Sequence, residues 1–288
     1  MLWRRLGLPG LFDLHTHFLP PNVMAKVRAQ FDAAGPLIGR EWPLAYRDDD
    51  ETLVEVLRGL GVRRFTALAY AHRPGMAEWL NDWAVGFADR VPEALRCATF
   101  FPEEGAGEYV AKRVAAGAEV FKVHVQVGAF DVRDPLLDEA WGVLEDASTP
   151  VVLHAGSGPV ATAYTGPGPV EGLLRRHPRL RLVIAHAGAP EYEEFQRLAE
   201  TFELVGLDTT MAFTDFFEEM GGAYPEALRP RLRDLGLAGR VFLGTDFPNI
   251  PYPYAHQFDA LERLGLGEDW LRAVCWDNAA TLFGTQGP

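Results

Sequence analysis

The chain has 288 residues, of which 48% are hydrophobic and 23% are charged, a balance typical of a globular protein with a large core. Its formal net charge of −13 argues against nucleic acids and anionic membrane surfaces as partners, because both repel an acidic protein. No window is apolar for long enough to form a transmembrane helix, and the two cysteines, which form no CxxC motif, fit a reducing cytoplasm.

Short apolar or β-branched runs alternate with longer helix-patterned stretches and predict about eight strands. In chain order they are Leu11–His17, Arg64–Tyr70, Leu95–Phe101, Val120–Val125, Pro150–His154, Leu180–His186, Leu204–Thr209 and Arg240–Gly244. A parallel strand returns through a crossover, so repeated strand–helix units predict parallel strands. Eight such units are typical of a (β/α)8 TIM barrel, and we expect residues 1–288 to form a single α/β domain of this kind.

The helix-patterned stretches carry start and stop signals. Leu53–Leu60 holds an apolar stripe at i, i+3, i+4 and i+7, and Gly61 follows it as a stop. Asp134 predicts an N-cap in front of Pro135, which suits the first turn of a helix. The closing segment Asp269–Phe283 predicts one final helix or a pair of helices.

Two stretches break the strand–helix rhythm. Leu19–Tyr46 is rich in proline, glycine and aromatic residues and is too long for a simple connection. Phe213–Leu235 is predicted to be a long helical insertion after the seventh strand. The first stretch either covers the barrel mouth or decorates the surface, and both interpretations stay open at this point.

Polar side chains follow several predicted strands, at the end of a barrel where enzymes carry their chemistry. They are His15 and His17 after the first strand, Lys122 and His124 on the fourth, His154 on the fifth, His186 on the sixth and Asp246 after the eighth. One histidine after an apolar strand is more often a hydrogen-bonded structural residue than a ligand. Separate strands that all place such residues at the same end favour a shared site.

The residue types in this set suit a metal ion. In an extended strand, alternate side chains share a face, so His15 and His17 could bind the same cation. Neutral imidazoles and a carboxylate are ligands that Zn²⁺ and similar first-row ions accept. Such a site can activate water or polarise a substrate carbonyl.

These motifs together resemble those of the amidohydrolase superfamily. The resemblance rests on His15-Thr16-His17, on His154 and His186, and on Gly244-Thr245-Asp246-Phe247-Pro248. The segment Trp276–Gly284 is similar to the Asn-Ala-Ala-x-x-Leu-Phe/Leu-Gly ending of that group. The branch that the chain most resembles is the amidohydrolase 2 family, which includes aminocarboxymuconate-semialdehyde decarboxylase and related hydrolases and decarboxylases. The pattern is specific for the superfamily and weak for the substrate.

The resemblance implies a set of roles for these residues. His15, His17, His154 and Asp246 would bind one divalent ion, Zn²⁺ in the first place, with Mn²⁺ or another first-row ion as an alternative. His186 would act as a general acid or base beside the activated water, and Asp246 would both bind the ion and accept a proton. The resemblance further suggests a small-molecule substrate and a homodimer.

Lys122 separates two versions of this site. In binuclear members of the superfamily, a carboxylated lysine on the fourth strand bridges two metal ions. In the mononuclear branch, a Lys-x-His on this strand occurs without carboxylation. Lys122 and His124 share a face in Lys122-Val123-His124, where both could meet a carboxylate of the substrate. We favour the mononuclear site, with these two residues binding substrate.

Other residues near these motifs have simpler interpretations. Asp13 shares the inward face of the histidine pair, and we expect it to form a buried hydrogen bond deeper in the barrel. Trp42, Tyr252 and Tyr254 lie in loops predicted to be near the mouth, where an apolar or aromatic substrate could pack.

Four functions compete for this pattern. The first is a metal-dependent hydrolase of a small ester, lactone or amide, and the second is a metal-dependent decarboxylase, a C–C lyase, acting on a small unsaturated or aromatic carboxylic acid. A DNase of the TatD type is disfavoured, because that group is expected to present a carboxylate where this chain has Lys122 and His124. A non-catalytic binding protein is disfavoured because such proteins normally lose metal ligands that are present here.

Overall fold

The computed structural model describes residues 1–285. These residues group into two compact units, the terminal unit, Met1–Thr66 with the chain from Asp208 onwards, and the central unit, Ala67–Leu207. Each unit combines parallel strands with helices. The prediction that the chain forms a single domain stays a prediction. Among the described residues, no helix is both long and apolar enough to cross a lipid bilayer.

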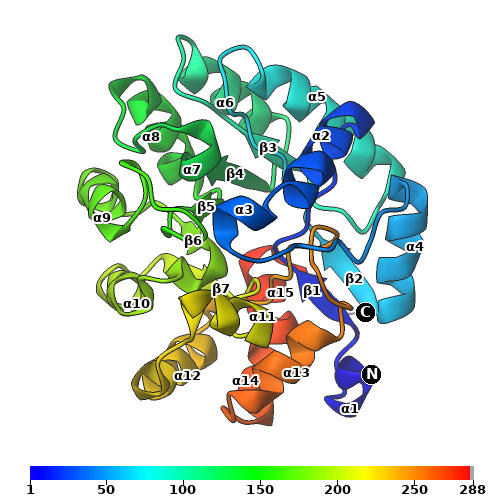
Figure 1. The fold of residues 1–288 in the computed structure, drawn as a ribbon. Coiled ribbons are helices and arrows are strands. Elements are labelled where there is room, and N and C mark those ends of the chain that lie inside the picture. Colours follow the sequence, from blue (N-terminus) through cyan, green and yellow to red (C-terminus); the bar gives the residue numbers. More distant parts are fainter. Residues whose placement is uncertain (286–288) are drawn as a thin grey trace. The chain divides into compact units, whose positions relative to one another are not determined.

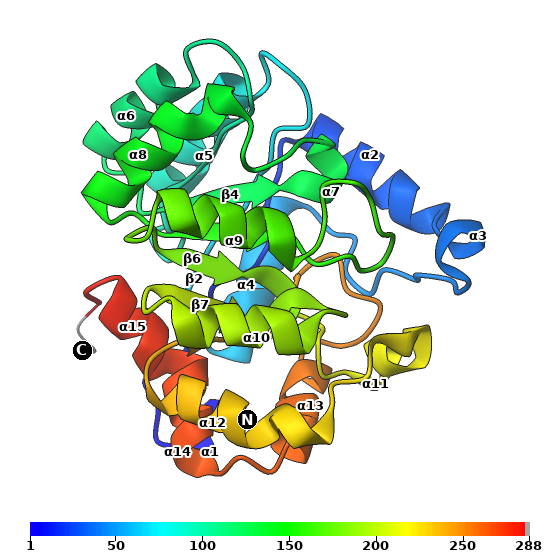
Figure 2. The same ribbon diagram turned by 90° about the vertical axis from the view of Figure 1, so that its left-hand side faces the viewer.

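The central unit contains a parallel sheet in which consecutive strands are neighbours. Its strands are β3 (Cys97–Thr99), β4 (Val120–His124), β5 (Val151–His154), β6 (Leu182–Ile184) and β7 (Val205–Asp208), whose last residue belongs to the terminal unit. Its longer helices are α5 (Ala77–Arg90), α6 (Ala106–Ala115), α8 (Asp138–Ala147), α9 (Pro167–Arg176) and α10 (Tyr192–Thr201). They lie along one side of these strands (Figures 1 and 2). Shorter helices connect these elements: α7 (Val125–Gly128) follows β4, η1 (Pro135–Leu137) precedes α8, and η2 (Ala185–Gly188) follows β6.

The strands of the central unit are apolar because both of their faces are buried. All four residues of β5 are buried, and β6 is buried throughout. Continuous apolar runs of this kind are typical of parallel strands covered on both sides. The register of β4 against β5 pairs His124 with His154, so the two predicted site residues lie at adjacent strand ends.

The terminal unit contains β1 (Leu11–Asp13), β2 (Val62–Phe65) and β8 (Val241–Phe242). Strands β1 and β2 pair in parallel and lie side by side in Figure 1. Its helices are α1 (Leu2–Arg5), α2 (Pro21–Asp32), α3 (Gly35–Ile38), α4 (Asp50–Leu60), α11 (Asp215–Phe217), η3 (Glu218–Gly222), η4 (Glu226–Leu228), α12 (Arg229–Leu237), α13 (His256–Arg263), α14 (Glu268–Arg272), η5 (Ala273–Asp277) and α15 (Asn278–Leu282).

The predicted helix signals are confirmed. Helix α4 begins after Asp49, whose side chain accepts a hydrogen bond from the backbone N–H of Thr52, and ends at Gly61, whose φ of 91° suits glycine. Asp134 caps the turn that opens at Pro135 and leads into α8. The closing segment forms three short consecutive helices.

All eight predicted strands are present, but several of their boundaries were wrong. Strand β1 ends at Asp13, two residues before the first histidine, because the Asp13 carboxylate accepts the backbone N–H of His15. Strand β6 ends at Ile184, because His186 has a φ of 55° and lies in the turn η2. Strand β2 ends at Phe65 rather than at Tyr70.

The two predicted insertions also have a defined structure. Leu19–Tyr46 contains α2 and α3, and Trp42 attaches it to the loop after β8, where its Nε1 donates to the backbone oxygen of Asn249 at 2.9 Å. Phe213–Leu235 is not one long helix but a series of short helices followed by most of α12. Gly221, with a φ of 86°, interrupts this series.

Candidate metal centre

The chain beyond β1 runs in register with the loop beyond β8. The backbone N–H of Leu14 donates to Leu243 at 2.8 Å, that of Asp246 donates to His15 at 2.8 Å, and that of His17 donates to Phe247 at 2.7 Å. Thr16 and Phe247 form a parallel bridge between the same two segments. This ladder fixes His15 and His17 against Asp246 even though neither histidine lies within a strand.

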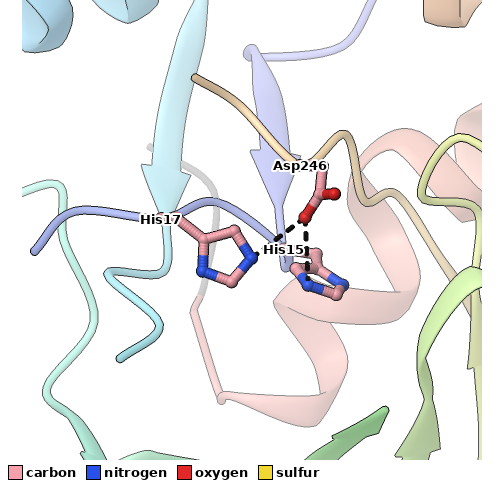
Figure 3. Close-up of side chains that lie close together, drawn as sticks. All are labelled: His15, His17 and Asp246. Atoms are coloured by element: carbon pink, nitrogen blue, oxygen red, sulfur yellow. Dashed lines mark hydrogen bonds and ion pairs between the residues drawn. The ribbon is translucent and has the colours of Figure 1, made fainter. Parts of the chain in front are cut away.

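The side chains of His15, His17 and Asp246 converge on one point (Figure 3). Oδ1 of Asp246 lies 2.9 Å from Nε2 of His17 and 3.5 Å from Nε2 of His15. The two imidazole rings meet edge to face with their centroids 5.1 Å apart. His15 and His17 are buried, and Asp246 is at the border between buried and half-buried. The terminal unit therefore brings together three of the four predicted metal ligands.

The spacing of these atoms fits a divalent ion. One potential ligand atom from each of the three residues lies within 4.8 Å of the other two. Two ligand atoms at about 2.1 Å from a tetrahedral ion lie about 3.4 Å apart, close to the separations seen here. Two imidazole nitrogens and one carboxylate oxygen are also a donor set that first-row divalent ions accept.

Asp208, at the end of β7, orients His15. Its Oδ2 lies 2.7 Å from Nδ1 of His15, and its Oδ1 accepts the backbone N–H of Thr210 at 3.0 Å. When Nδ1 donates its proton to this carboxylate, Nε2 keeps its lone pair for a metal ion. A carboxylate behind a histidine is the usual arrangement at metal sites in proteins.

We expect Asp208→Asn to weaken divalent-metal binding by about 10- to 100-fold, because the amide lacks the charge that orients and polarises His15. Competition with a chromophoric chelator would measure the affinity, and circular dichroism would verify the fold. Unchanged affinity in the folded variant would show that Asp208 does not support the centre.

Asp208 was not predicted to be a site residue, although the sequence contains a signal for it. Asp208 is a polar residue that closes an apolar strand, as His154 and His186 do in their predicted strands. The expectation for Asp13 is confirmed, because this side chain is fully buried and hydrogen-bonded. Burial raises the pKa of the Asp13 carboxyl to about 7, whereas hydrogen bonds from Thr245 and Tyr254 lower it.

Asp246 and His186 share an uncommon backbone conformation. Their φ angles are 70° and 55°, in the left-handed region that few side chains other than asparagine and aspartate adopt readily. Residues held in this region cluster at functional sites, where the surrounding structure compensates the strain. Both residues were predicted to be catalytic from the sequence.

The central unit gathers the other predicted histidines. The rings of His124 and His154 stack with centroids 3.9 Å apart, and the His186 ring meets the His154 ring edge to face at 4.8 Å. His124 also caps α7, where its Nδ1 accepts the backbone N–H of Val127 at 3.3 Å. Lys122 is fully buried two residues before His124 on β4. The metal-binding role of His154 and the substrate-binding roles of Lys122 and His124 stay predictions.

Comparison with solved structures gives the class of fold. An uncharacterised TIM-barrel protein from Bordetella bronchiseptica is 18% identical, with a TM-score of 0.74 over 95% of this chain and 99% of that one. A probable 2-pyrone-4,6-dicarboxylic acid hydrolase from Acinetobacter baumannii, solved with citric acid, is 13% identical, with a TM-score of 0.60 over 96% and 99%. A 5-carboxyvanillate decarboxylase from Novosphingobium aromaticivorans, solved with manganese, is 12% identical, with a TM-score of 0.59 over 96% and 97%. The fold is an α/β TIM barrel, as the strand pattern predicts.

Comparison with protein families gives the particular group. The amidohydrolase family model matches residues 12–285, which is nearly the whole chain. The protein belongs to the amidohydrolase 2 family, and the resemblance seen in its motifs is confirmed. No curated protein matches the sequence.

Proposed function

We propose that the protein is a metal-dependent hydrolase of a small ester, lactone or amide. The observation that carries this proposal is the convergence of His15, His17 and Asp246, with Asp208 behind His15. Histidines that bind a metal ion commonly donate their other ring nitrogen to a carboxylate, as His15 can to Asp208. Membership of an amidohydrolase family supports the same conclusion.

We propose one ion per chain, held by His15, His17, Asp246 and His154. The first three have the geometry described above, and the family motif supports the fourth. Zn²⁺ suits this donor set, and the decarboxylase solved with manganese supports Mn²⁺ as the alternative. When bound, the ion would lower the pKa of a water molecule and polarise the carbonyl of the substrate.

The side chains of the protein would divide the remaining work. Asp246 would accept a proton from the attacking water, because its carboxylate lies where the two imidazoles converge. His186 would return a proton to the leaving group, and its left-handed backbone holds the ring next to His154. Lys122 and His124 would bind an acidic group of the substrate, because they share one face of β4.

Decarboxylation of a small unsaturated or aromatic carboxylic acid is the second candidate. A buried lysine beside a histidine on the same face suits a substrate that carries a carboxylate. One of the structural neighbours is a 5-carboxyvanillate decarboxylase and another a probable hydrolase of a dicarboxylic acid, so both reactions occur on this fold.

The fate of water and of the carboxyl carbon separates the two reactions. Purified protein would be incubated in H₂¹⁸O with a panel of lactones, esters, amides and aromatic acids, and products would be identified by mass spectrometry. We expect ¹⁸O in a product carboxylate without release of CO₂. Release of CO₂ from a product that carries no ¹⁸O, and a deuterium on the product carbon when D₂O is used, would contradict hydrolysis and establish the lyase.

We also propose that the protein acts on a small molecule in the cytoplasm, as a homodimer, and binds neither nucleic acid nor membranes. The net charge of −13 supports the absence of polyanionic partners. The two cysteines are buried and form no CxxC motif, which supports a reducing compartment. The proposal of a homodimer rests only on the resemblance to the family.

A further inference from the structure

The carboxylate of Asp13 is fully buried beneath the candidate metal centre and accepts three hydrogen bonds. Oδ1 accepts the backbone N–H of His15 at 3.1 Å. Oδ2 accepts the hydroxyl of Thr245 at 2.6 Å and the hydroxyl of Tyr254 at 2.8 Å. Hydrogen bonds to a carboxylate in a dry interior are strong, and removing one donor makes the buried carboxylate less well stabilised.

These three donors come from three segments of the chain. His15 lies on the extension of β1, Thr245 lies on the loop after β8 directly before Asp246, and Tyr254 lies on the segment that leads into α13. Asp13 thus binds the backbone of one metal ligand and the neighbour of another. Asp13 therefore adds a side-chain link between the β1 extension and the loop that carries Asp246, beside the backbone ladder that already joins these two segments.

Tyr254 itself is held rigidly. The sequence suggested that its ring lines the mouth, but this prediction was wrong, because the side chain is fully buried. Its backbone N–H donates to the Tyr46 hydroxyl at 2.8 Å, and its ring packs against Phe247 and Phe258 with centroids 5.9 and 5.5 Å away. Burial raises the pKa of the Tyr254 hydroxyl well above its usual value, so this group is a hydrogen-bond donor.

We propose that Tyr254 is a positioning residue of the metal centre, which acts through Asp13 to fix His15 against Asp246. The inference rests on the metal centre proposed above. Tyr254 is not one of the three residues whose side chains converge at the centre, and its effect is transmitted by the Asp13 carboxylate and two hydrogen bonds. The hydroxyl of Thr245 is the second side-chain donor to Oδ2 of Asp13.

The test is metal binding by Tyr254→Phe, which removes one hydroxyl and keeps the ring. Co²⁺ titration, followed by the visible absorption of the bound ion, reports affinity and coordination geometry without any substrate. We expect about tenfold weaker binding and a changed absorption band, in the range for residues that support metal ligands. Tyr224→Phe is the matched control, because it also removes a buried tyrosine hydroxyl from the terminal unit, one that donates to the backbone oxygen of Leu228.

A purely structural role has a different signature. It would lower the unfolding temperature of the metal-free variant and leave the Co²⁺ affinity and spectrum of the folded protein as in the wild type, and this result would overturn the proposal. If Tyr254→Phe does not fold, Thr245→Val and Thr245→Ser decide. We expect about tenfold weaker Co²⁺ binding for the valine variant and near wild-type binding for the serine variant, which keeps the hydroxyl. Equal affinities in the two would overturn the proposal, whereas a wild-type protein that binds no divalent ion would overturn the metal centre instead.

Discussion

Asp246→Asn is expected to release the bound metal and to lower turnover by about 10³-fold, because a metal-activated water contributes several kcal/mol and each 1.36 kcal/mol corresponds to a factor of ten. The amide is neutral and is a poor ligand for a first-row ion. Asparagine adopts the left-handed conformation almost as readily as aspartate, so the φ of 70° is retained at little cost. Asp246→Ala, by contrast, would combine loss of the ligand with backbone strain.

Metal content per chain, measured by inductively coupled plasma mass spectrometry, is the direct readout. We expect about one equivalent in the wild type and far less in Asp246→Asn. Asp234→Asn, a change of the same chemistry at an exposed position, serves as the control and should keep the wild-type content. Full metal content and activity in Asp246→Asn would refute the site, and about two equivalents in the wild type would favour the binuclear centre with carboxylated Lys122.

Gly244→Ala is expected to disrupt the same centre by crowding the side chains of His15 and Asp208. A Cβ at this position would overlap Oγ1 of Thr210 and would lie 2.9 Å from Cβ of His15 and 3.2 Å from Cγ of Asp208. His15 and Asp208 would have to separate, although their side chains are only 2.7 Å apart. Overpacking of this kind costs about 1–3 kcal/mol of the free energy of unfolding, and we expect weaker metal binding in addition.

Gly142→Ala is the matched control for this change. Gly142 lies within α8, and its added Cβ would meet no atom within 4 Å. Alanine favours a helix more than glycine does, so this variant should gain about 0.5–1 kcal/mol. Urea denaturation and Co²⁺ titration would compare the two variants. Wild-type stability and metal affinity in Gly244→Ala would show that the packing beneath His15 is not required.

The order and type of the strands could be predicted because most of them lie in short runs of apolar or β-branched residues. Their ends could not, because they depend on interactions that hydrophobicity does not record. Asp13 ends β1 by accepting the backbone N–H of His15, and a positive φ at His186 ends β6. Neither effect changes the apolar pattern, so the histidines seemed to be part of the strands.

The convergence of His15, His17 and Asp246 could be predicted, because these residues follow predicted strands whose carboxyl ends lie on one side of a barrel. The residues that support them were harder to recognise. Asp208 was overlooked, and Tyr254 was interpreted as a substrate contact because aromatic residues in a loop usually suggest one. Its hydroxyl contact with Asp13 joins residues 241 positions apart, which no local pattern can reveal.

The ladder between the β1 extension and the loop after β8 has a consequence for biosynthesis. His17 and Asp246 are 229 positions apart in the chain. During translation, His15 and His17 therefore emerge from the ribosome long before Asp246 has been synthesised. An ion captured by the early histidines alone would be held by two imidazoles and exchanged readily. Stable binding of the proposed ion would therefore belong to the last stage of folding, after the eighth strand has emerged and docked.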